Sequence, residues 1–113
     1  MRKILSLEKT NVDAANAIQN YHADIVSDIE KAIIGYEWVV VGMKQNPVVR
    51  SAKNLLTEKK IPFHYIEHGG YFSKWKQRLA IKLWSGWPTF PQVFHKGVLI
   101  GGHSDLKKYL ASI

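Results

Sequence analysis

The start of one predicted helix is the place in this chain where chemistry would be expected. The stretch "KQNPVVRSAK" leaves the apolar run "WVVVGM" and turns through an Asn-Pro pair into a helical pattern. A turn from a strand into a helix often presents a reactive group. None of the side chains from Asn46 to Val49 is a nucleophile, an acid or a base, however, and Ser51 lies a full helical turn further on with no base beside it. The turn therefore offers a cation, Lys44, and no nucleophile.

Cysteine and histidine usage argues against metal chemistry. The chain has no cysteine, which excludes disulfides, thiolate catalysis and cysteine-ligated metal or iron–sulfur sites. Its five histidines are His22, His64, His68, His95 and His103. They do not show the spacing of neighbouring ligands, and no acidic residue completes a ligand set. We therefore expect neither a metal ion nor an iron–sulfur cluster.

The charge of the chain favours an anionic partner. A formal net charge of +7 and a pI near 9.7 fit nucleic acid, an acidic membrane surface or small carboxylate and phosphate ligands. The basic residues are dispersed, which is typical of a solvated surface, so we expect no nucleic-acid partner. The sequence contains neither the apolar core of a signal peptide nor a run of membrane-spanning length. We expect a cytoplasmic protein without a membrane partner.

The first three predicted elements include the strand and the helix that position the turn. Apolar residues at helical spacing over 13–34 predict an N-terminal helix with Gly35 as its C-cap. The β-branched run over 37–43 predicts a strand that is buried on both faces. Pro47 then begins a second helix. The apolar stripe expected on this helix is Val48, Ala52, Leu55 and Leu56.

The stretch "KKIPFHYIEH" contains the second predicted strand. Two further strands and two further helices are predicted after it. A helix is predicted over 72–84, and its apolar stripe is Phe72, Trp75, Leu79 and Leu83. A hairpin is then predicted from Gln92–Phe94 to Val98–Ile100, with its turn through His95, Lys96 and Gly97. The final helix is expected to have Ser104 as its N-cap. Its apolar stripe is Leu106, Tyr109, Leu110 and Ile113.

This order of elements predicts an α/β fold. The first strand, helix and second strand form a βαβ unit with parallel strands, and the hairpin adds an antiparallel pair. The result is a four-stranded mixed sheet flanked by helices, the thioredoxin-like arrangement. A chain of 113 residues is long enough for one domain. We expect a single domain over 1–113, with an N-terminal helical extension over 1–35 and the core over 36–113.

Three segments resemble the glutaredoxin family in order and separation: "VVGMKQNPVVRSAKNLL", "RLAIKLWSGWPTFPQVF" and "GVLIGGHSDL". The first puts Asn46 and Val49 where a dithiol glutaredoxin has the two cysteines of Cys-Pro-Tyr-Cys. The second is very similar to the monothiol-type sequence in which a basic helix runs into Trp-Pro-Thr-x-Pro-Gln-Val. The third is similar to the glutathione loop Gly-Gly-x-Ser/Thr-Asp. The N-terminal helix resembles an extra helix of monothiol-type members.

The resemblance implies a site for glutathione, which carries two carboxylates and one ammonium group. Lys44 matches a basic residue that points at the pocket, and Arg78 and Lys82 match residues that reach the glycyl carboxylate. The proline of the family is cis and exposes the backbone of the preceding residue. The matching segment here is Thr89, Phe90 and Pro91.

The glycine loop completes the implied site. After Gly102, the amides near Ser104 and Asp105 would bind the γ-glutamyl carboxylate at a helix N-terminus, and Asp105 would receive the ammonium group. Each residue also has a purely structural interpretation: Pro91 as the start of a strand, Ser104 and Asp105 as a helix cap, and the basic pair on 78 and 82 as a solvated helix face.

The chain departs from the family at its reactive residue. Family members attack a glutathione mixed disulfide with a cysteine thiolate, which Asn46 and Val49 cannot supply. We therefore expect a glutaredoxin-like protein that is not a competent thiol oxidoreductase, although the family acts in cell redox homeostasis. Three hypotheses stay open: a module that binds glutathione or a glutathionylated or γ-glutamyl ligand, a scaffold that faces an acidic protein partner, and an enzyme that uses the thiol of glutathione itself.

Overall fold

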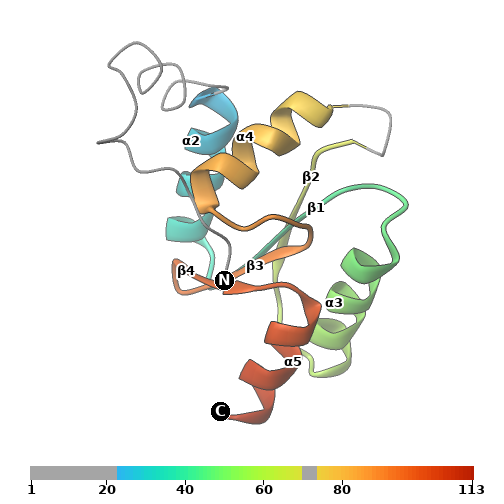
Figure 1. The fold of residues 1–113 in the computed structure, drawn as a ribbon. Coiled ribbons are helices and arrows are strands. Elements are labelled where there is room, and N and C mark those ends of the chain that lie inside the picture. The colour runs from blue at the N-terminus through green and yellow to red at the C-terminus, as the bar shows by residue number, and fades with distance from the viewer. Residues whose placement is uncertain (1–22, 70–73) are drawn as a thin grey trace.

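The computed structural model describes residues 23–69 and 74–113 of the chain. Within them, helices and strands follow the order predicted from the sequence (Figure 1). The helices are α2 (Ala23–Gly35), α3 (Pro47–Glu58), α4 (Trp75–Ser85) and α5 (His103–Ala111). The strands are β1 (Trp38–Gly42), β2 (His64–Glu67), β3 (Gln92–His95) and β4 (Val98–Gly101).

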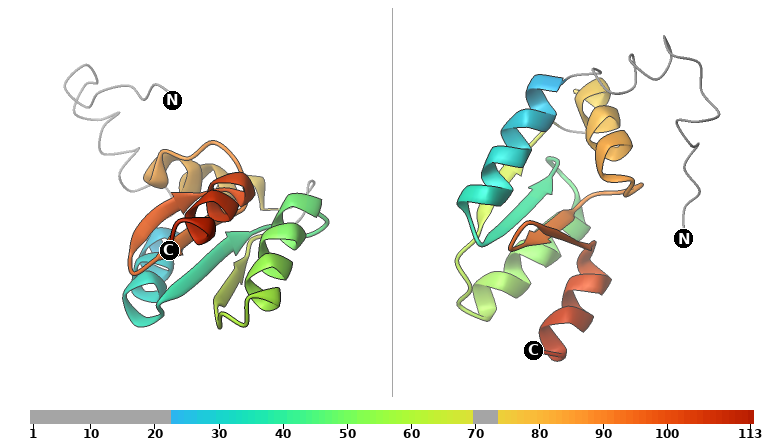
Figure 2. Two further views of the ribbon diagram at one scale, coloured as in Figure 1. Left: turned by 90° about the horizontal axis from the view of Figure 1, so that it is seen from below. Right: turned by 90° about the vertical axis from the view of Figure 1, so that its left-hand side faces the viewer.

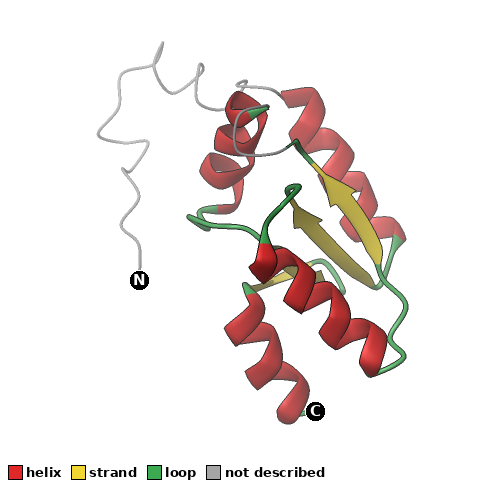
Figure 3. Cartoon of the chain, turned by 90° about the vertical axis from the view of Figure 1, so that its right-hand side faces the viewer, coloured by secondary structure: helices red, strands yellow, loops and turns green. Residues whose placement is uncertain are grey.

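The strands form one mixed sheet in the order β2-β1-β3-β4. β1 pairs in parallel with β2, where Val40 lies opposite Tyr65, and antiparallel with β3, where Val40 lies opposite Val93. β3 and β4 form the predicted hairpin. Figure 3 shows β1 and β2 side by side, with α3 connecting them over one face of the sheet. All five residues of β1 are buried, as expected for a strand covered on both faces.

Two layers of helices cover the sheet. α2 and α4 lie on one face, and α3 and α5 lie on the other (Figures 1 and 2). Alternate residues of β1 contribute to opposite hydrophobic clusters, because side chains alternate across a strand. The cluster on the α2 and α4 face includes Val39, Val41, Ile29 and Ile81. The cluster on the α3 and α5 face includes Trp38, Val40, Leu56 and Leu106.

The extra N-terminal helix is confirmed by α2, whose Ile29 is fully buried against the sheet. Gly35 is the last residue of α2 and not a cap beyond it. The predicted start of this helix, over 13–22, lies outside the described residues, as does Phe72 of the predicted stripe before α4.

The predicted stripe of α3 is wrong at its first position. Val48 is 47% exposed, whereas Val49 is buried together with Ala52 and Leu56. Asn46 is the N-cap and Pro47 the first helical residue, so the third residue of the helix is the one that faces the sheet. From Val49, steps of three and four residues lead to the other two buried positions.

The predicted stripe of α4 is also wrong. Trp75, Leu79 and Leu83 are 57%, 38% and 39% exposed, and the buried residues are Arg78, Ala80 and Ile81. The opposite side of the helix can face the interior because the Arg78 guanidinium Nη1 donates to the backbone oxygen of His68 at 2.9 Å. A buried cation is tolerated when it is hydrogen-bonded.

The hairpin and α5 differ in detail from the prediction. His95 is the last residue of β3, so the turn consists of Lys96 and Gly97, which have φ of 53° and 79°. Both values are positive, as in the type I′ turn that favours two-residue hairpins. Ser104 is not the N-cap of α5, because Gly102 holds that position. Ile113 lies beyond the helix and is 73% exposed.

Candidate functional site

The turn between β1 and α3 is held by backbone hydrogen bonds to the residues that follow β2. The Lys44 amide donates to the Gly69 oxygen at 2.6 Å, and the His68 amide donates to the Gly42 oxygen at 3.0 Å. Gln45 has a φ of 59°, in the left-handed region that a tight turn requires. Parallel pairing of β1 with β2 therefore continues just past the strand ends and fixes the entry into α3.

Asn46 closes the N-terminus of α3. Its side-chain oxygen Oδ1 accepts hydrogen bonds from the amides of Val48, at 2.9 Å, and Val49, at 3.1 Å. These amides have no partner inside a helix and are the groups that would stabilise an anion at this position. In this chain a neutral carboxamide already satisfies them.

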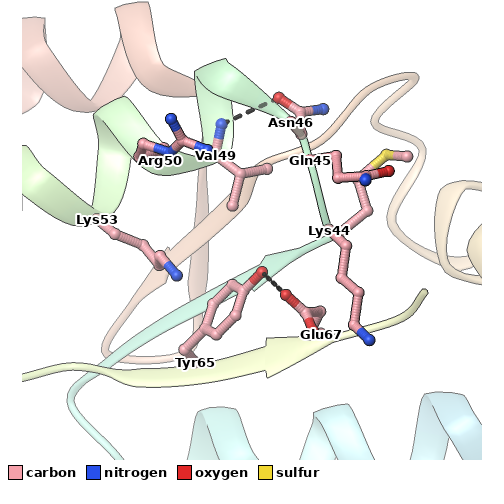
Figure 4. A pocket seen from close by; sticks show the side chains of 9 residues that line it. Lys44, Gln45, Asn46, Val49, Arg50, Lys53, Tyr65 and Glu67 are labelled. Carbon is pink, nitrogen blue, oxygen red and sulfur yellow. Dashed lines mark hydrogen bonds between the residues drawn. The ribbon is translucent and has the colours of Figure 1, made fainter. Parts of the chain in front are cut away.

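A pocket of about 330 Å³ opens beside Asn46, between the start of α3 and the end of β2 (Figure 4). The residues that line it are Met43, Lys44, Gln45, Asn46, Val49, Arg50, Lys53, Tyr65 and Glu67. Three of these side chains are cations and one is a carboxylate, so the pocket carries a net positive charge.

The wall of this pocket on β2 is ordered by Tyr65. Its hydroxyl donates to Glu67 Oε1 at 3.1 Å, and Lys53 Nζ lies 3.9 Å from the centre of its ring. Burial raises the pKa of the Tyr65 phenol above its ordinary value, and the hydrogen bond to Glu67 and the charge of that carboxylate act in the same direction. The phenol therefore stays protonated and keeps the carboxylate engaged.

The second part of the predicted site precedes β3. The peptide bond between Phe90 and Pro91 is cis, as the resemblance implies. Phe90 is 6% exposed and Thr89 is exposed. Lys82 Nζ lies 5.7 Å from the centre of the Phe90 ring, which brings the cation of α4 to this segment.

The glycine loop lies against the same segment. A Cβ atom on Gly102 would lie 3.7 Å from the Pro91 oxygen, 3.8 Å from Trp87 Nε1 and 4.0 Å from Asp105 Oδ2. The Gly102 amide donates to Asp105 Oδ2 at 3.1 Å, so this carboxylate caps α5. Ser104 is exposed one residue earlier in the helix.

The register of the sheet relates the two parts of the site. Val41 of β1 lies opposite Gln92 of β3, so in this antiparallel register Met43 and Phe90 lie two residues beyond the pair, at the same end of the two strands. Met43, Val49 and Phe90 also belong to one hydrophobic cluster. The turn that carries Lys44 and the segment that carries Pro91 are therefore neighbours.

Arg78, which was predicted as a ligand-binding residue, is buried. It is 7% exposed and donates to His68, as described above. Its role toward a carboxylate remains a prediction. The pKa of His68 is lowered mainly by burial, and the charges of Lys74 and Arg78 act in the same direction. The charge of Asp28 acts in the opposite direction.

The sequence interpretation missed one feature at each part of the site. Trp87 Nε1 is buried beside Gly102 and has no hydrogen-bond partner among the described residues. The sequence does show this tryptophan in "WPTFP". A tryptophan by itself, however, favours a packing role over a binding role. Arg50 and Lys53, three residues apart on α3, line the pocket beside Asn46. That spacing puts the two cations on one side of α3. The pocket also requires Tyr65 and Glu67, which line it from β2.

The described residues contain no group of three or more histidines, aspartates or glutamates that could hold a metal ion. Over the same part of the chain, no helix has the length and apolar character needed to cross a membrane.

The fold has the thioredoxin-like arrangement of known glutaredoxins. A wheat glutaredoxin matches with a TM-score of 0.69 and 23% identity, covering 80% of this chain and 84% of that one. A buckwheat glutaredoxin in complex with glutathione matches with a TM-score of 0.72 and 18% identity, covering 83% and 86% of the two chains.

Sequence comparison makes the assignment more specific. The family model described as glutaredoxin matches residues 39–100. A glutaredoxin-like protein of Dictyostelium discoideum is 46% identical over 109 residues, which cover 96% of this chain and 87% of that protein. The chain belongs to the glutaredoxin family, and it has no cysteine.

Proposed function

We propose that this protein is a binding member of the glutaredoxin family, which holds glutathione or a glutathionylated or γ-glutamyl ligand without thiol–disulfide exchange. The ligand would lie across the neighbouring segments that carry Lys44, Phe90 and Pro91, and the glycine loop. It would meet cations on one side and the Asp105 carboxylate on the other.

The observation that carries the proposal is the meeting of two segments at Gly102: the loop that carries Trp87 and Pro91, and the glycine loop with Asp105. Trp87, Pro91 and Asp105 each place a polar atom within 4.0 Å of the position of an added Cβ. The buried indole N–H of Trp87 has no partner among the described residues, although a buried donor is normally paired. A peptide ligand supplies carbonyl oxygens of the kind that this donor lacks.

Charge supports a ligand with both signs. Lys82 reaches the Phe90 ring, and Lys44 is exposed at the turn before α3. One oxygen of Asp105 accepts from Gly102, and the other makes no hydrogen bond within the described residues, so it can receive an ammonium group. A buckwheat neighbour was solved with glutathione, which supports this ligand class on the same fold.

The absence of exchange chemistry follows from the residues at the turn. Asn46 uses its oxygen as a helix cap and has no ionisable group. The nearest hydroxyl, on Ser51, donates to the Pro47 oxygen at 3.0 Å, as a serine commonly does within a helix. Neither residue is an activated nucleophile.

An NMR titration of isotope-labelled protein with reduced glutathione, up to millimolar concentration, tests the proposal. We expect shifts confined to the backbone amides of Phe90 and 102–105 and to the indole N–H of Trp87. Trp87→Phe should weaken binding several-fold with little change in stability, because it removes an unpaired donor and keeps most of the ring packing. Asp105→Asn is the matched variant for charge, since an amide oxygen can still cap α5.

A flat titration would contradict the proposal and leave the scaffold hypothesis in its place. Shifts spread evenly over the basic surface would also contradict it, because they would report only attraction of an anion to a positively charged protein.

A further inference from the structure

The carboxamide of Asn46 has a fixed orientation. Because Oδ1 accepts from two backbone amides, the side-chain nitrogen Nδ2 must point away from α3, as Figure 4 shows. The nitrogen has two N–H groups to donate. The position at which the family carries a thiol therefore presents a hydrogen-bond donor.

The pocket beside this donor is built to receive acceptors. Lys44, Arg50 and Lys53 bring positive charge to its lining, and the single carboxylate, Glu67, accepts the hydroxyl of Tyr65. The Asn46 oxygen is occupied by the helix cap. A thiol is a weak donor and gains little from a lining with three cations, whereas an anionic oxygen group finds several donors.

We propose that the ligand of this protein is a glutathione derivative whose sulfur carries an anionic, oxygen-rich group, and that this group enters the pocket between α3 and β2. The inference rests on the proposed function, because the peptide part of the ligand is needed to bring its sulfur to Asn46. It adds the class of ligand: an oxidised or acid-substituted glutathione in preference to the free thiol.

Two analogues test the preference. Glutathione sulfonate carries three oxygens and a negative charge on its sulfur, and S-methylglutathione is the neutral match that keeps the peptide. Measured by calorimetry in low salt, the sulfonate should bind about tenfold more tightly, the size of effect expected for a charge-assisted hydrogen bond. The ratio of the two affinities should fall as salt is added, because ions screen the exposed cations.

Variants of the pocket make the test specific. The double variant Arg50→Gln, Lys53→Gln should bring the affinity of the sulfonate close to that of S-methylglutathione without weakening the latter. Lys107→Gln removes an exposed positive charge from α5 and is the control for overall charge. Asn46→Asp keeps a cap oxygen but replaces the donor with a negative charge, so it should abolish the preference. Asn46→Ser keeps a cap without the amide and should reduce it.

The outcomes separate the two proposals. Equal affinity of both analogues, with shifts at Phe90 and Gly102, would overturn this inference and leave glutathione binding intact. The inference is overturned in the same way if Lys107→Gln lowers the ratio as much as the pocket variants do. Absence of binding by every glutathione compound would overturn the proposed function, and this inference with it.

Discussion

The two parts of the site differ in how well their polar groups are satisfied. At the start of α3, Asn46 accepts from the amides of Val48 and Val49, and at the end of β2, Tyr65 and Glu67 are paired with each other. Around Gly102, by contrast, the indole N–H of Trp87 is buried without a partner among the described residues. The polar groups at the turn with Asn46 are therefore paired within the protein, and those around Gly102 are not. This difference is what the proposed binding of a peptide ligand beside Gly102 requires.

The largest expected effect comes from placing a sulfur at position 46. In Asn46→Cys, the thiol takes the cap position, where the two amides at the start of α3 and the nearby Lys44 lower the pKa of a thiol. We expect glutathione-dependent disulfide reduction to rise from background to a measurable rate. Asn46→Ser, which keeps an oxygen cap, should remain inactive. If an alkylating reagent modifies the cysteine variant readily but the variant reduces no disulfide, the proposed groove for glutathione is not intact.

The packing behind the turn gives the next largest effect. A Cβ on Gly42 would lie 2.6 Å from Val49 Cγ1 and 3.0 Å from Tyr65 Cε1, so Gly42→Ala forces the buried start of α3 away from β1. We expect a loss of about 2 kcal/mol in the free energy of unfolding, measured with urea. Gly35→Ala is the matched control, because nothing lies within 4 Å of its added methyl group. Equal stability of the two variants would show that the turn is not held by close packing.

A smaller effect is expected from removing the cap. Asn46→Ala leaves the amides of Val48 and Val49 without their acceptor and should cost about 1 kcal/mol of unfolding free energy. Asn46→Asp should retain most of the stability, since aspartate caps helices as well as asparagine does. If Asn46→Ala is as stable as the unchanged protein, the hydrogen bonds that Asn46 accepts do not stabilise the start of α3. The contrast between the two parts of the site is then wrong.

The smallest effect concerns pH. The pKa of His68 is lower in the folded protein than its ordinary value, so the unfolded chain binds a proton more readily. Stability contributed by neutral His68 is present above pH 6.5, the ordinary pKa, and is lost as the pH falls through the folded pKa. Urea unfolding at a series of pH values should show this decline, and His68→Gln should flatten it. An unchanged slope in the variant would assign the decline to other groups.

The sequence predicted the elements better than it predicted which faces they bury. Strong periodicity located every described helix and strand, because a buried β-branched run and a repeated apolar stripe are local properties. The predicted orientation of α4 is wrong, since Trp75, Leu79 and Leu83 form a regular stripe that the structure leaves exposed. The burial of Arg78 instead depends on the backbone oxygen of His68, ten residues away, which periodicity does not register.

The site was predicted only as far as its motifs extend. Pro91, Gly102 and Asp105 lie close together, and their role in binding stays a prediction, whereas the pocket beside Asn46 has no motif. It requires Arg50 and Lys53 of α3 to face Tyr65 and Glu67 of β2, and that arrangement follows from the parallel register of β1 and β2. The spacing of residues along one helix does not reveal which side chains of a neighbouring strand face them.

The asparagine cap has a consequence for the conditions under which the protein can work. A thiol relative loses its nucleophile to peroxide or to a shift in the reduction potential of its surroundings. Here the residue at that position cannot be oxidised in this way, and the sulfur that lines the pocket belongs to Met43, which is 8% exposed. The binding that we propose should therefore survive pretreatment of the protein with an oxidising or a reducing agent, when it is measured afterwards with a ligand of fixed oxidation state.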